Sequence, residues 1–357
     1  MHANESTYRL CAVGDICLSD HPLRSGYGIG SRAAQMGVEG LLGSVAEILA
    51  DSDDSFANLE TAVAEKISGD KPFLCEEHYL TQLASCGFTL LSVANNHSLD
   101  HGSSGFDNTV RLLQARQLPA LGVADADGSC IPVIRQHQNI SVCWLAYNTI
   151  LKPRDNYPYA TLTDMSKVTA HISVCREQFD HVIVSCHWGL ELMKDAPAQI
   201  KFAARAMVDA GASLILGHHP HVTQEFERYG AGVIAYSLGD FLLDLDWCEA
   251  SKSTAILRVE LLKDRVGNCD YVKIRRNANL QLEAQGVENI PVVAHSIKPI
   301  NENIDLTNPR VFGDAYLQRY RRALIKNQIS KSVFLLKNLH RFGIKRLFAL
   351  FAKKVFG

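Results

Sequence analysis

Short apolar runs rich in β-branched residues recur along the first two thirds of the chain. Runs of this length that are apolar throughout predict strands buried on both faces of a sheet. The expected strands are Leu10–Val13, Leu90–Ala94, Ile140–Ala146, His181–Ser185, Ser213–Leu216 and Val233–Ser237. Amphipathic stretches that predict helices alternate with them: Val38–Ala50, Thr109–Gln117 and Ala198–Ala210. This alternation predicts an α/β fold with a substantial sheet.

A polar motif follows most of these runs. The motifs are Val13-Gly14-Asp15, Asn58-Leu59-Glu60, Asn95-Asn96-His97, His187-Trp188-Gly189-Leu190-Glu191 and Gly217-His218-His219-Pro220-His221. Imidazole nitrogens, carboxylate oxygens and amide oxygens are the groups that hold divalent metals. Each motif alone has a plainer interpretation as a turn, an exposed carboxylate or a structural histidine. Because strand ends gather distant stretches of chain, the five together predict a metal site.

The histidine-rich motif is the sharpest of the five. Residues two apart in an extended segment face the same side, so His219 and His221 are predicted to present their rings together. Pro220 favours that extended shape. His218 is then expected to face the other way, which makes it the weakest candidate ligand. The alternative is three structural histidines in four positions, which would be unusual.

The second histidine motif combines an amide with an imidazole. Asn96 can offer its carbonyl oxygen to a metal while His97 points at a substrate, and Asp100 is placed to orient that imidazole. A polar turn is an equally good interpretation of this segment. Asp240, in the later Ser237–Phe241 stretch, is left open between a residue that orients a ligand histidine and a simple turn residue.

In order and spacing these motifs resemble the CapA family of capsule synthesis proteins, also called poly-γ-glutamate synthesis proteins, within the calcineurin-like metallophosphoesterase superfamily. The resemblance runs from about Tyr8 to Leu245. It implies a four-layer α/β/β/α sandwich with the metal site at the strand ends between the layers. It implies a ligand set of Asp15, Glu60, Asn96, His187, His219 and His221. It further implies that His97 protonates a leaving group with Asp100 as its partner, and that Glu191 is a ligand or a base.

The resemblance also implies a function in capsule or exopolymer biosynthesis. The expected activity is that of a metal-dependent hydrolase or transferase, which uses one or two Mn, Fe or Zn ions on an anionic polymer or phosphoester. Lys152 and Arg154 are candidates to hold such a substrate, with a solvated loop as the alternative. A non-catalytic accessory of a capsule polymer ligase or exporter is the competing hypothesis. Cys17 motivates it, because phosphoesterases of this superfamily typically carry a histidine there.

Two further positions depart from the family pattern. Leu192 stands where an aromatic residue is usual, and Asp240 stands where the family usually has Asn.

We divide the chain into residues 8–250 as a CapA-like metallophosphoesterase domain, 251–309 as closing strands and linker, and 310–357 as a basic helical tail. Turn residues 264–268 separate two expected late strands, 255–262 and 270–274.

Charge is distributed unevenly between tail and body. Residues 315–357 contain six Lys, five Arg and no acid, so this segment carries +11 and the other 314 residues carry −13. Apolar side chains of residues 330–357 gather opposite basic ones, which predicts binding to an anionic membrane surface. A helix docked on the acidic body or on a second subunit is the alternative. Nucleic acid is not an expected partner, because the tail has no recognisable reader fold.

Cysteine usage and the polar N-terminal start point to a cellular setting. The ten Cys residues are scattered without a Cys-x-x-Cys pair, and no apolar stretch reaches the length of a signal core or a spanning helix. These features predict a cytoplasmic protein, peripheral on the inner face of the membrane if the tail binds there. Capsule synthesis or export machinery is an expected partner.

Overall fold

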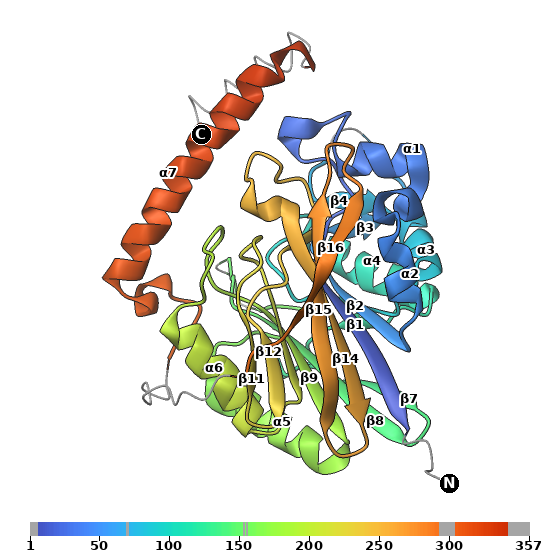
Figure 1. Cartoon of the computed structure of the whole chain (residues 1–357), viewed down its shortest axis with the longest axis vertical. Helices are drawn as coiled ribbons and strands as arrows, with labels where there is room; N and C mark the ends of the chain where they lie inside the picture. Colours follow the sequence, from blue (N-terminus) through green and yellow to red (C-terminus); the bar gives the residue numbers. More distant parts are fainter. Residues whose placement is uncertain (1–5, 69–70, 153, 155, 293–303, 342–357) are drawn as a thin grey trace.

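The structure is a computed structural model that describes residues 6–68, 71–152, 154, 156–292 and 304–341. Two large β-sheets face each other, and helices cover their outer faces (Figure 1). The predicted α/β/β/α sandwich is therefore confirmed. A long C-terminal helix lies along one side of it.

The first sheet has eight strands. In spatial order they are β16 (Leu282–Asn289), β15 (Val266–Arg276), β14 (Ser253–Leu262), β1 (Thr7–Ile16), β2 (Asp54–Leu59), β5 (Leu90–Ser92) and β6 (Ala120–Leu121), with β13 (Asp240–Leu242) paired to the end of β1. Strands β1, β2, β5 and β6 run parallel, and β14 pairs antiparallel with β1. The late strands predicted at 255–262 and 270–274 are thus direct extensions of this sheet.

The second sheet has six strands, of which the central four are parallel. In spatial order they are β11 (Phe226–Tyr229), β12 (Gly232–Ala235), β10 (Leu214–His218), β9 (His181–His187), β8 (Ile140–Asn148) and β7 (Val133–His137). A separate pair is formed by β3 (Ala62–Ala64) and β4 (Leu74–Glu76). Each of the six strands predicted from the apolar runs is present.

Helices form the outer layers, and short 3-10 turns occur between other elements and at the end of the described chain. Those beside the first sheet are α1 (Ile29–Leu42), α2 (Val45–Ala50), α3 (His78–Ser85) and α4 (Gly102–Ala115). Those beside the second sheet are α5 (Met165–Gln178) and α6 (Ala198–Asp209). The 3-10 turns are η1 (Pro22–Arg24), η2 (Ala250–Lys252), η3 (Pro309–Phe312) and η4 (Leu339–Arg341).

One predicted helix is divided in two. The stretch Val38–Ala50 was expected to be continuous, but α1 ends at Leu42 and α2 begins at Val45. Gly43 has φ of +54°, a conformation that helical residues do not adopt and that glycine takes without a steric cost. The positive φ of Gly43 separates the two helices, although the apolar periodicity of the sequence continues from one to the other.

Strand β8 shows why the apolar runs are continuous. Val142 and Trp144 pack into the core between the sheets, whereas Cys143 and Leu145 pack against the outer helices. Side chains alternate between the faces of a strand, so a strand with layers on both sides needs apolar residues at every position. The Trp144 ring stacks on Phe56 of the first sheet with centroids 5.3 Å apart, which joins the two sheets.

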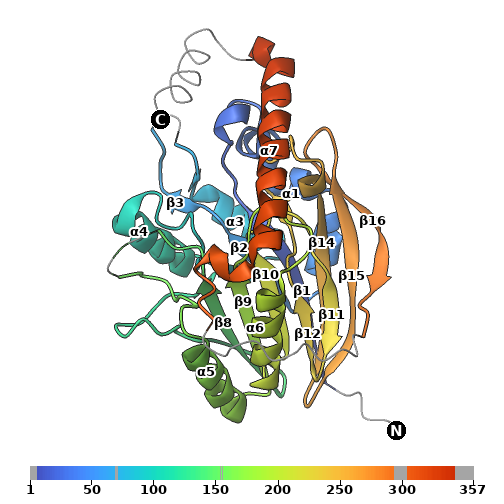
Figure 2. The same ribbon diagram turned by 90° about the vertical axis from the view of Figure 1, so that its left-hand side faces the viewer.

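The last described helix is α7 (Asp314–Lys337), which lies across one side of the body (Figure 2). Most of the apolar residues on which the membrane prediction rested fall in 342–357, outside the described residues. Within the described part of the chain, no helix is both long and apolar enough to cross a membrane.

Candidate metal centre

The carboxyl ends of parallel strands from both sheets meet at one end of the sandwich. Asp15 lies near the end of β1, and Glu60 follows directly after β2. In the second sheet, His187 ends β9 and His218 ends β10, where the two are neighbours in register. Ligand sites in sheets of this kind form at such strand ends, because that is where loops leave the sheet together.

Asp15 is fully buried and held by groups from both sheets. Asn58 Nδ2 donates a 2.8 Å hydrogen bond to Asp15 Oδ1, and His218 Nδ1 lies 3.1 Å from the same oxygen. Burial alone would raise the pKa of Asp15. The hydrogen bond and the charge of His218 outweigh that effect, so the pKa lies below its usual value. His218 does not face away from the site as predicted: it lies behind Asp15 and contacts its carboxylate.

Strand β13 brings a further carboxylate to this point. Asp240 pairs with Asp15 in register, and Gly14 permits the close approach because a Cβ there would lie 1.8 Å from the Gly239 carbonyl oxygen. Asp240 Oδ1 is 2.8 Å from His221 Nδ1. Burial lowers the pKa of His221, but nearby carboxylates, Asp240 foremost, raise it overall. This contact fits the first of the two roles left open for Asp240, that of orienting a histidine.

Glu60 and His187 approach each other from opposite sheets. His187 Nε2 lies 3.5 Å from Glu60 Oε1 and 2.7 Å from Asn96 Oδ1. Burial raises the pKa of Glu60 well above its usual value, and the Asp15 carboxylate adds to that effect. Burial lowers the pKa of His187 well below its usual value. The imidazole is therefore neutral, which is the form that binds metals.

His219 and His221 both enter the site, but the predicted extended segment is wrong. Strand β10 ends at His218, and the two residues have φ of +93° and +60°. A neighbouring loop pairs with the chain at this turn, where Leu192 N donates a 2.7 Å hydrogen bond to the Pro220 carbonyl oxygen. A left-handed loop, not strand alternation, brings the two imidazoles together.

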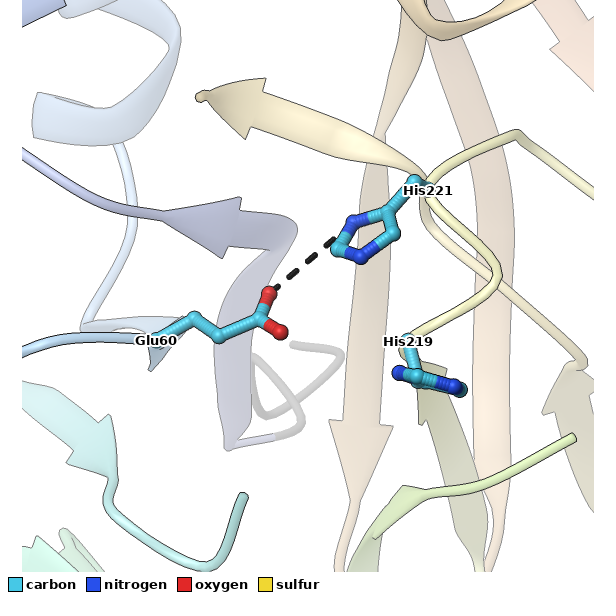
Figure 3. Close-up of side chains that lie close together, drawn as sticks. All are labelled: Glu60, His219 and His221. Atoms are coloured by element: carbon cyan, nitrogen blue, oxygen red, sulfur yellow. Dashed lines mark ion pairs between the residues drawn. The ribbon is translucent and has the colours of Figure 1, made fainter. Parts of the chain in front are cut away.

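Two groups of three side chains have the spacing of a metal site. Glu60, His219 and His221 each offer a ligand atom within 4.8 Å of the others, and Asp15, His221 and Asp240 do the same. Figure 3 shows the Glu60 side chain reaching from one side toward the two histidines on the other. The groups share His221, so the donors form one continuous cluster.

Unpartnered polar atoms gather in this cluster. Among the described residues, no hydrogen bond reaches the buried atoms Glu60 Oε1 and Oε2, His218 Nε2, His219 Nδ1 and Asp240 Oδ2. Buried polar groups are nearly always paired, because an unpaired one loses its hydration without compensation. Burial also lowers the pKa of His219 to about 4 and raises that of Asp240 to about 6. Carboxylate oxygens and imidazole nitrogens left free in this way fit a divalent cation.

A histidine–aspartate pair borders the cluster. His97 Nδ1 is 2.6 Å from Asp100 Oδ2, and its Nε2 lies 3.9 Å from Glu60 Oε1. The imidazole stacks on the Phe73 ring with centroids 3.5 Å apart, which fixes its plane. Lys152 Nζ donates a 2.6 Å hydrogen bond to the other Asp100 oxygen. Burial raises the pKa of Asp100, but the His97 and Lys152 contacts lower it overall.

A cavity of about 160 Å³ adjoins the cluster. His97, Glu191 and His221 line one part of it, Cys17 another, and Lys331 of α7 a third. Burial raises the pKa of Glu191, but the charges of His221, His219 and Lys331 lower it overall. Burial raises the pKa of the Cys17 thiol to about 12, and its Sγ lies 3.2 Å from Ser19 Oγ. A neutral thiol is a poor metal ligand.

The structure brings the predicted site residues to one place, in or beside the cluster: Asp15, Glu60, Asn96, His97, Asp100, His187, Glu191, His219 and His221. Sequence reasoning assigned no role to Asn58, although it precedes Glu60 by two positions at the same strand end. It also missed Lys331, for which the sequence carries no local signal. Arg154 instead donates to Ser103 Oγ.

Comparison with known proteins extends these observations. The chain is 26% identical over 289 residues to the capsule biosynthesis protein CapA of Bacillus anthracis, covering 76% of this chain and 68% of that protein. It is 30% identical over 198 residues to the PGA biosynthesis protein CapA of Bacillus subtilis, covering 54% and 52%. The chain thus spans about half the length of the second relative.

A solved structure and a family model complete the comparison. A phosphatase from Mycoplasma pneumoniae superposes with a TM-score of 0.49 at 11% identity, covering 76% of this chain and 94% of that one. Residues 9–245 match the model of the bacterial capsule synthesis protein family PGA_cap. The matched segment contains every predicted metal-binding and proton-transfer residue. The chain belongs to this capsule synthesis family.

Proposed function

We propose that the protein is a metal-dependent hydrolase of capsule or poly-glutamate biosynthesis, acting on an anionic polymer or a phosphoester. The observation that carries this proposal is the set of unpartnered buried polar atoms beside a cavity lined by a histidine–aspartate pair. Polar groups that serve only to stabilise a fold are paired within the protein. These atoms have no partner among the described residues, and they lie beside a cavity that a substrate group would occupy.

The metal would be held by the six residues of the predicted set, with Asp240 orienting His221. They are Asp15, Glu60, Asn96, His187, His219 and His221. Mixed imidazole, carboxylate and amide donors suit Mn, Fe or Zn better than Mg or Ca, which prefer oxygen alone. A bound ion would supply a Lewis acid that neutralises negative charge on a substrate oxygen.

His97 is the proposed proton donor. Asp100 accepts from Nδ1, so Nε2 remains free to carry a proton toward a leaving oxygen. The Asp100 carboxylate fixes the tautomer and the orientation of the imidazole, as a carboxylate does in other histidine dyads. Stacking on Phe73 keeps the ring from rotating away. Lys152 holds the second Asp100 oxygen and so limits its motion.

The test compares metal content and turnover in matched variants. Purified wild type is expected to bind near-stoichiometric metal by elemental analysis, and His219→Ala combined with His221→Ala is expected to lose it. With Mn²⁺ supplied, wild type should hydrolyse a chromogenic phosphodiester or shorten poly-γ-glutamate. His97→Gln should keep its metal and lose about a hundredfold to ten-thousandfold in rate. Unchanged turnover in His97→Gln would remove His97 from the mechanism.

A second candidate function is a non-catalytic accessory with a structural metal. Cys17 favours it, because a buried neutral thiol stands where phosphoesterases of the superfamily typically have a ligand histidine. On this hypothesis, metal removal would lower the thermal midpoint while neither substrate class is turned over at any metal concentration. Turnover that depends on His97 would exclude it.

The tail is proposed to contact an anionic membrane surface. Four large apolar side chains are exposed along one face of α7: Ile325, Ile329, Val333 and Leu336. Exposed basic residues flank them, including Arg322 and Lys326. Apolar and basic side chains on one helical face match a surface of acyl chains and anionic headgroups.

A further inference from the structure

Helix α7 reaches the cavity from outside the segment that matches the family. That segment ends at residue 245, whereas α7 covers Asp314–Lys337. Figure 1 shows the helix lying along one side of the body, apart from both sheets. Lys331, in its last two turns, lines the same cavity as His97 and Glu191. The metal centre therefore has one wall that the family motifs do not supply.

The N-terminal part of α7 is anchored to the body by specific contacts. Tyr316 is buried, and its hydroxyl donates a 2.8 Å hydrogen bond to the Asp195 carbonyl oxygen. Arg319 forms a two-pronged ion pair with the Asp195 carboxylate at 3.0 and 2.7 Å. Leu317 and Tyr320 pack against the core beside α6. These contacts fix where the helix starts across the site.

The C-terminal part of α7 is held by aromatic rings. The Phe334 ring meets the edge of Trp247 with centroids 5.7 Å apart, and Trp247 in turn meets His21 at 4.6 Å. Arg341, just beyond the helix, lies 4.6 Å from the centre of the Tyr27 ring. Both ends being docked, the helix presents Lys331 to the cavity in a defined position.

Lys331 stands out by charge. Among the described residues that line the cavity it is the only lysine or arginine, whereas Asp20, Glu191 and Asp244 are acids. Its ammonium lies 5.3 Å from the centre of the Trp247 ring. No carboxylate of the described residues is within ion-pair distance of it. The group is thus a positioned cation whose three donors are free for a ligand.

We propose that Lys331 binds an anionic group of the substrate, next to the group that reacts at the metal centre. An acid-lined cavity repels anions, and one ammonium at its wall gives a second anionic group a place to bind. The ligand chemistry is an oxyanion, either a phosphate or a carboxylate. The link to catalysis rests on the proposed function, whereas the binding itself can be measured without turnover.

The experiment measures ligand affinity by isothermal titration calorimetry on the full chain loaded with Mn²⁺. The probes are inorganic phosphate and glutarate, which separate the two oxyanion classes. Lys331→Met should weaken the recognised probe by about ten- to hundredfold, the effect of losing a hydrogen bond to a charged group. Lys331→Arg should restore most of the affinity. Lys326→Met is the matched control, because Lys326 is exposed on the same helix away from the cavity.

The outcomes separate this proposal from the proposed function. Weaker binding in Lys331→Met alone, with an unchanged thermal midpoint and metal content, supports the proposal even if no substrate is turned over. Equal affinity in Lys331→Met and wild type would overturn it, as would no binding of either probe to wild type. Equal losses in Lys331→Met and Lys331→Arg would also overturn it, because they would show a packing role rather than a charge role.

Discussion

Strand β2 carries a buried carboxylate at each end, and the two have opposite surroundings. Asp54, at its start, accepts hydrogen bonds from Tyr8, from Thr89 Oγ1 at 2.6 Å and from two Arg135 nitrogens at 2.9 and 2.7 Å. Glu60, just after its end, has no hydrogen bond to either oxygen among the described residues. Six positions separate a fully paired carboxylate from an unpaired one.

The difference teaches how to separate structural from functional polar groups here. Burial alone does not distinguish them, since both carboxylates have essentially no exposed surface. Pairing does, because a carboxylate held by donors stabilises one arrangement of its neighbours, whereas a buried carboxylate without donors is available to bind a ligand. Histidines follow the same division. His181 has partners at both ring nitrogens, whereas His219 Nδ1 has none among the described residues.

The largest expected effect breaks the paired end. Asp54→Asn should lower the free energy of unfolding by about 2–4 kcal/mol, because Arg135 and Tyr8 lose the carboxylate that accepts their hydrogen bonds. Arg135 is partly exposed, which keeps the loss below that of a fully buried pair. Glu60→Gln, the matched change at the other end, should alter it by less than about 1 kcal/mol in metal-free protein. Urea denaturation with EDTA measures both. Equal losses of stability in the two variants would contradict the distinction between a paired structural carboxylate and an unpaired functional one.

Metal addition should separate the same two variants in the opposite order, because it depends on Glu60 and not on Asp54. At free Mn²⁺ a hundred times its Kd, wild type and Asp54→Asn should each gain about 2.7 kcal/mol of stability, because the ion binds only the folded chain. Glu60→Gln should gain little or nothing. Differential scanning calorimetry with and without Mn²⁺ tests this. A full gain in Glu60→Gln would show that the metal does not use this carboxylate.

A smaller effect concerns the pH dependence of stability at His181, the paired histidine. Burial lowers the pKa of His181, whose ring bonds Ser213 Oγ and the Leu262 carbonyl oxygen. A histidine with a lowered folded-state pKa contributes stability above its unfolded value of about 6.5, and that stability is lost as the pH falls below it. His181→Gln should therefore reduce the loss of stability between about pH 7.5 and about pH 5.5. If the urea midpoints of variant and wild type fall by the same amount over this pH range, the prediction is wrong.

The smallest effect concerns the two faces of α7. Its inner face is partnered, whereas Ile329 on its outer face is 60% exposed. Ile329→Ser should weaken binding to phosphatidylserine vesicles by roughly fivefold, equal to about 1 kcal/mol of partial burial. Val174→Ser, on the exposed side of α5, is the matched control and should leave binding unchanged. Vesicle co-sedimentation measures both, and equal binding in all three proteins would contradict a membrane role.

Much of the sandwich could be predicted because its evidence is local. A strand buried on both faces must be apolar at each position, and the polar residues that follow it mark the end where loops leave the sheet. Asp15, Glu60 and His187 were placed in this way. Their convergence needed only the rule that parallel strands share one carboxyl end.

The remaining features depend on contacts between distant segments. The backbone of His219 and His221 is left-handed next to a loop that contacts it through Leu192, and no pattern around the histidines reveals that contact. The backbone breaks at Gly43, although the apolar pattern of the sequence continues past that residue. Lys331 reaches the cavity only because Tyr316 and Phe334 dock α7 at its two ends. Such arrangements follow from packing and not from periodicity.

The pairing of β1 with β13 and β14 has a consequence for biosynthesis of the chain. Strand β1 is among the first segments to be made, yet Asp240, which pairs with Asp15, and Leu257–Leu262, which pair with Thr7–Ala12, are made more than two hundred residues later. Pairings so far apart in sequence form late, because a long loop must close first. The metal donors therefore stay separated on a growing chain, and the centre assembles only once nearly the whole family domain has emerged.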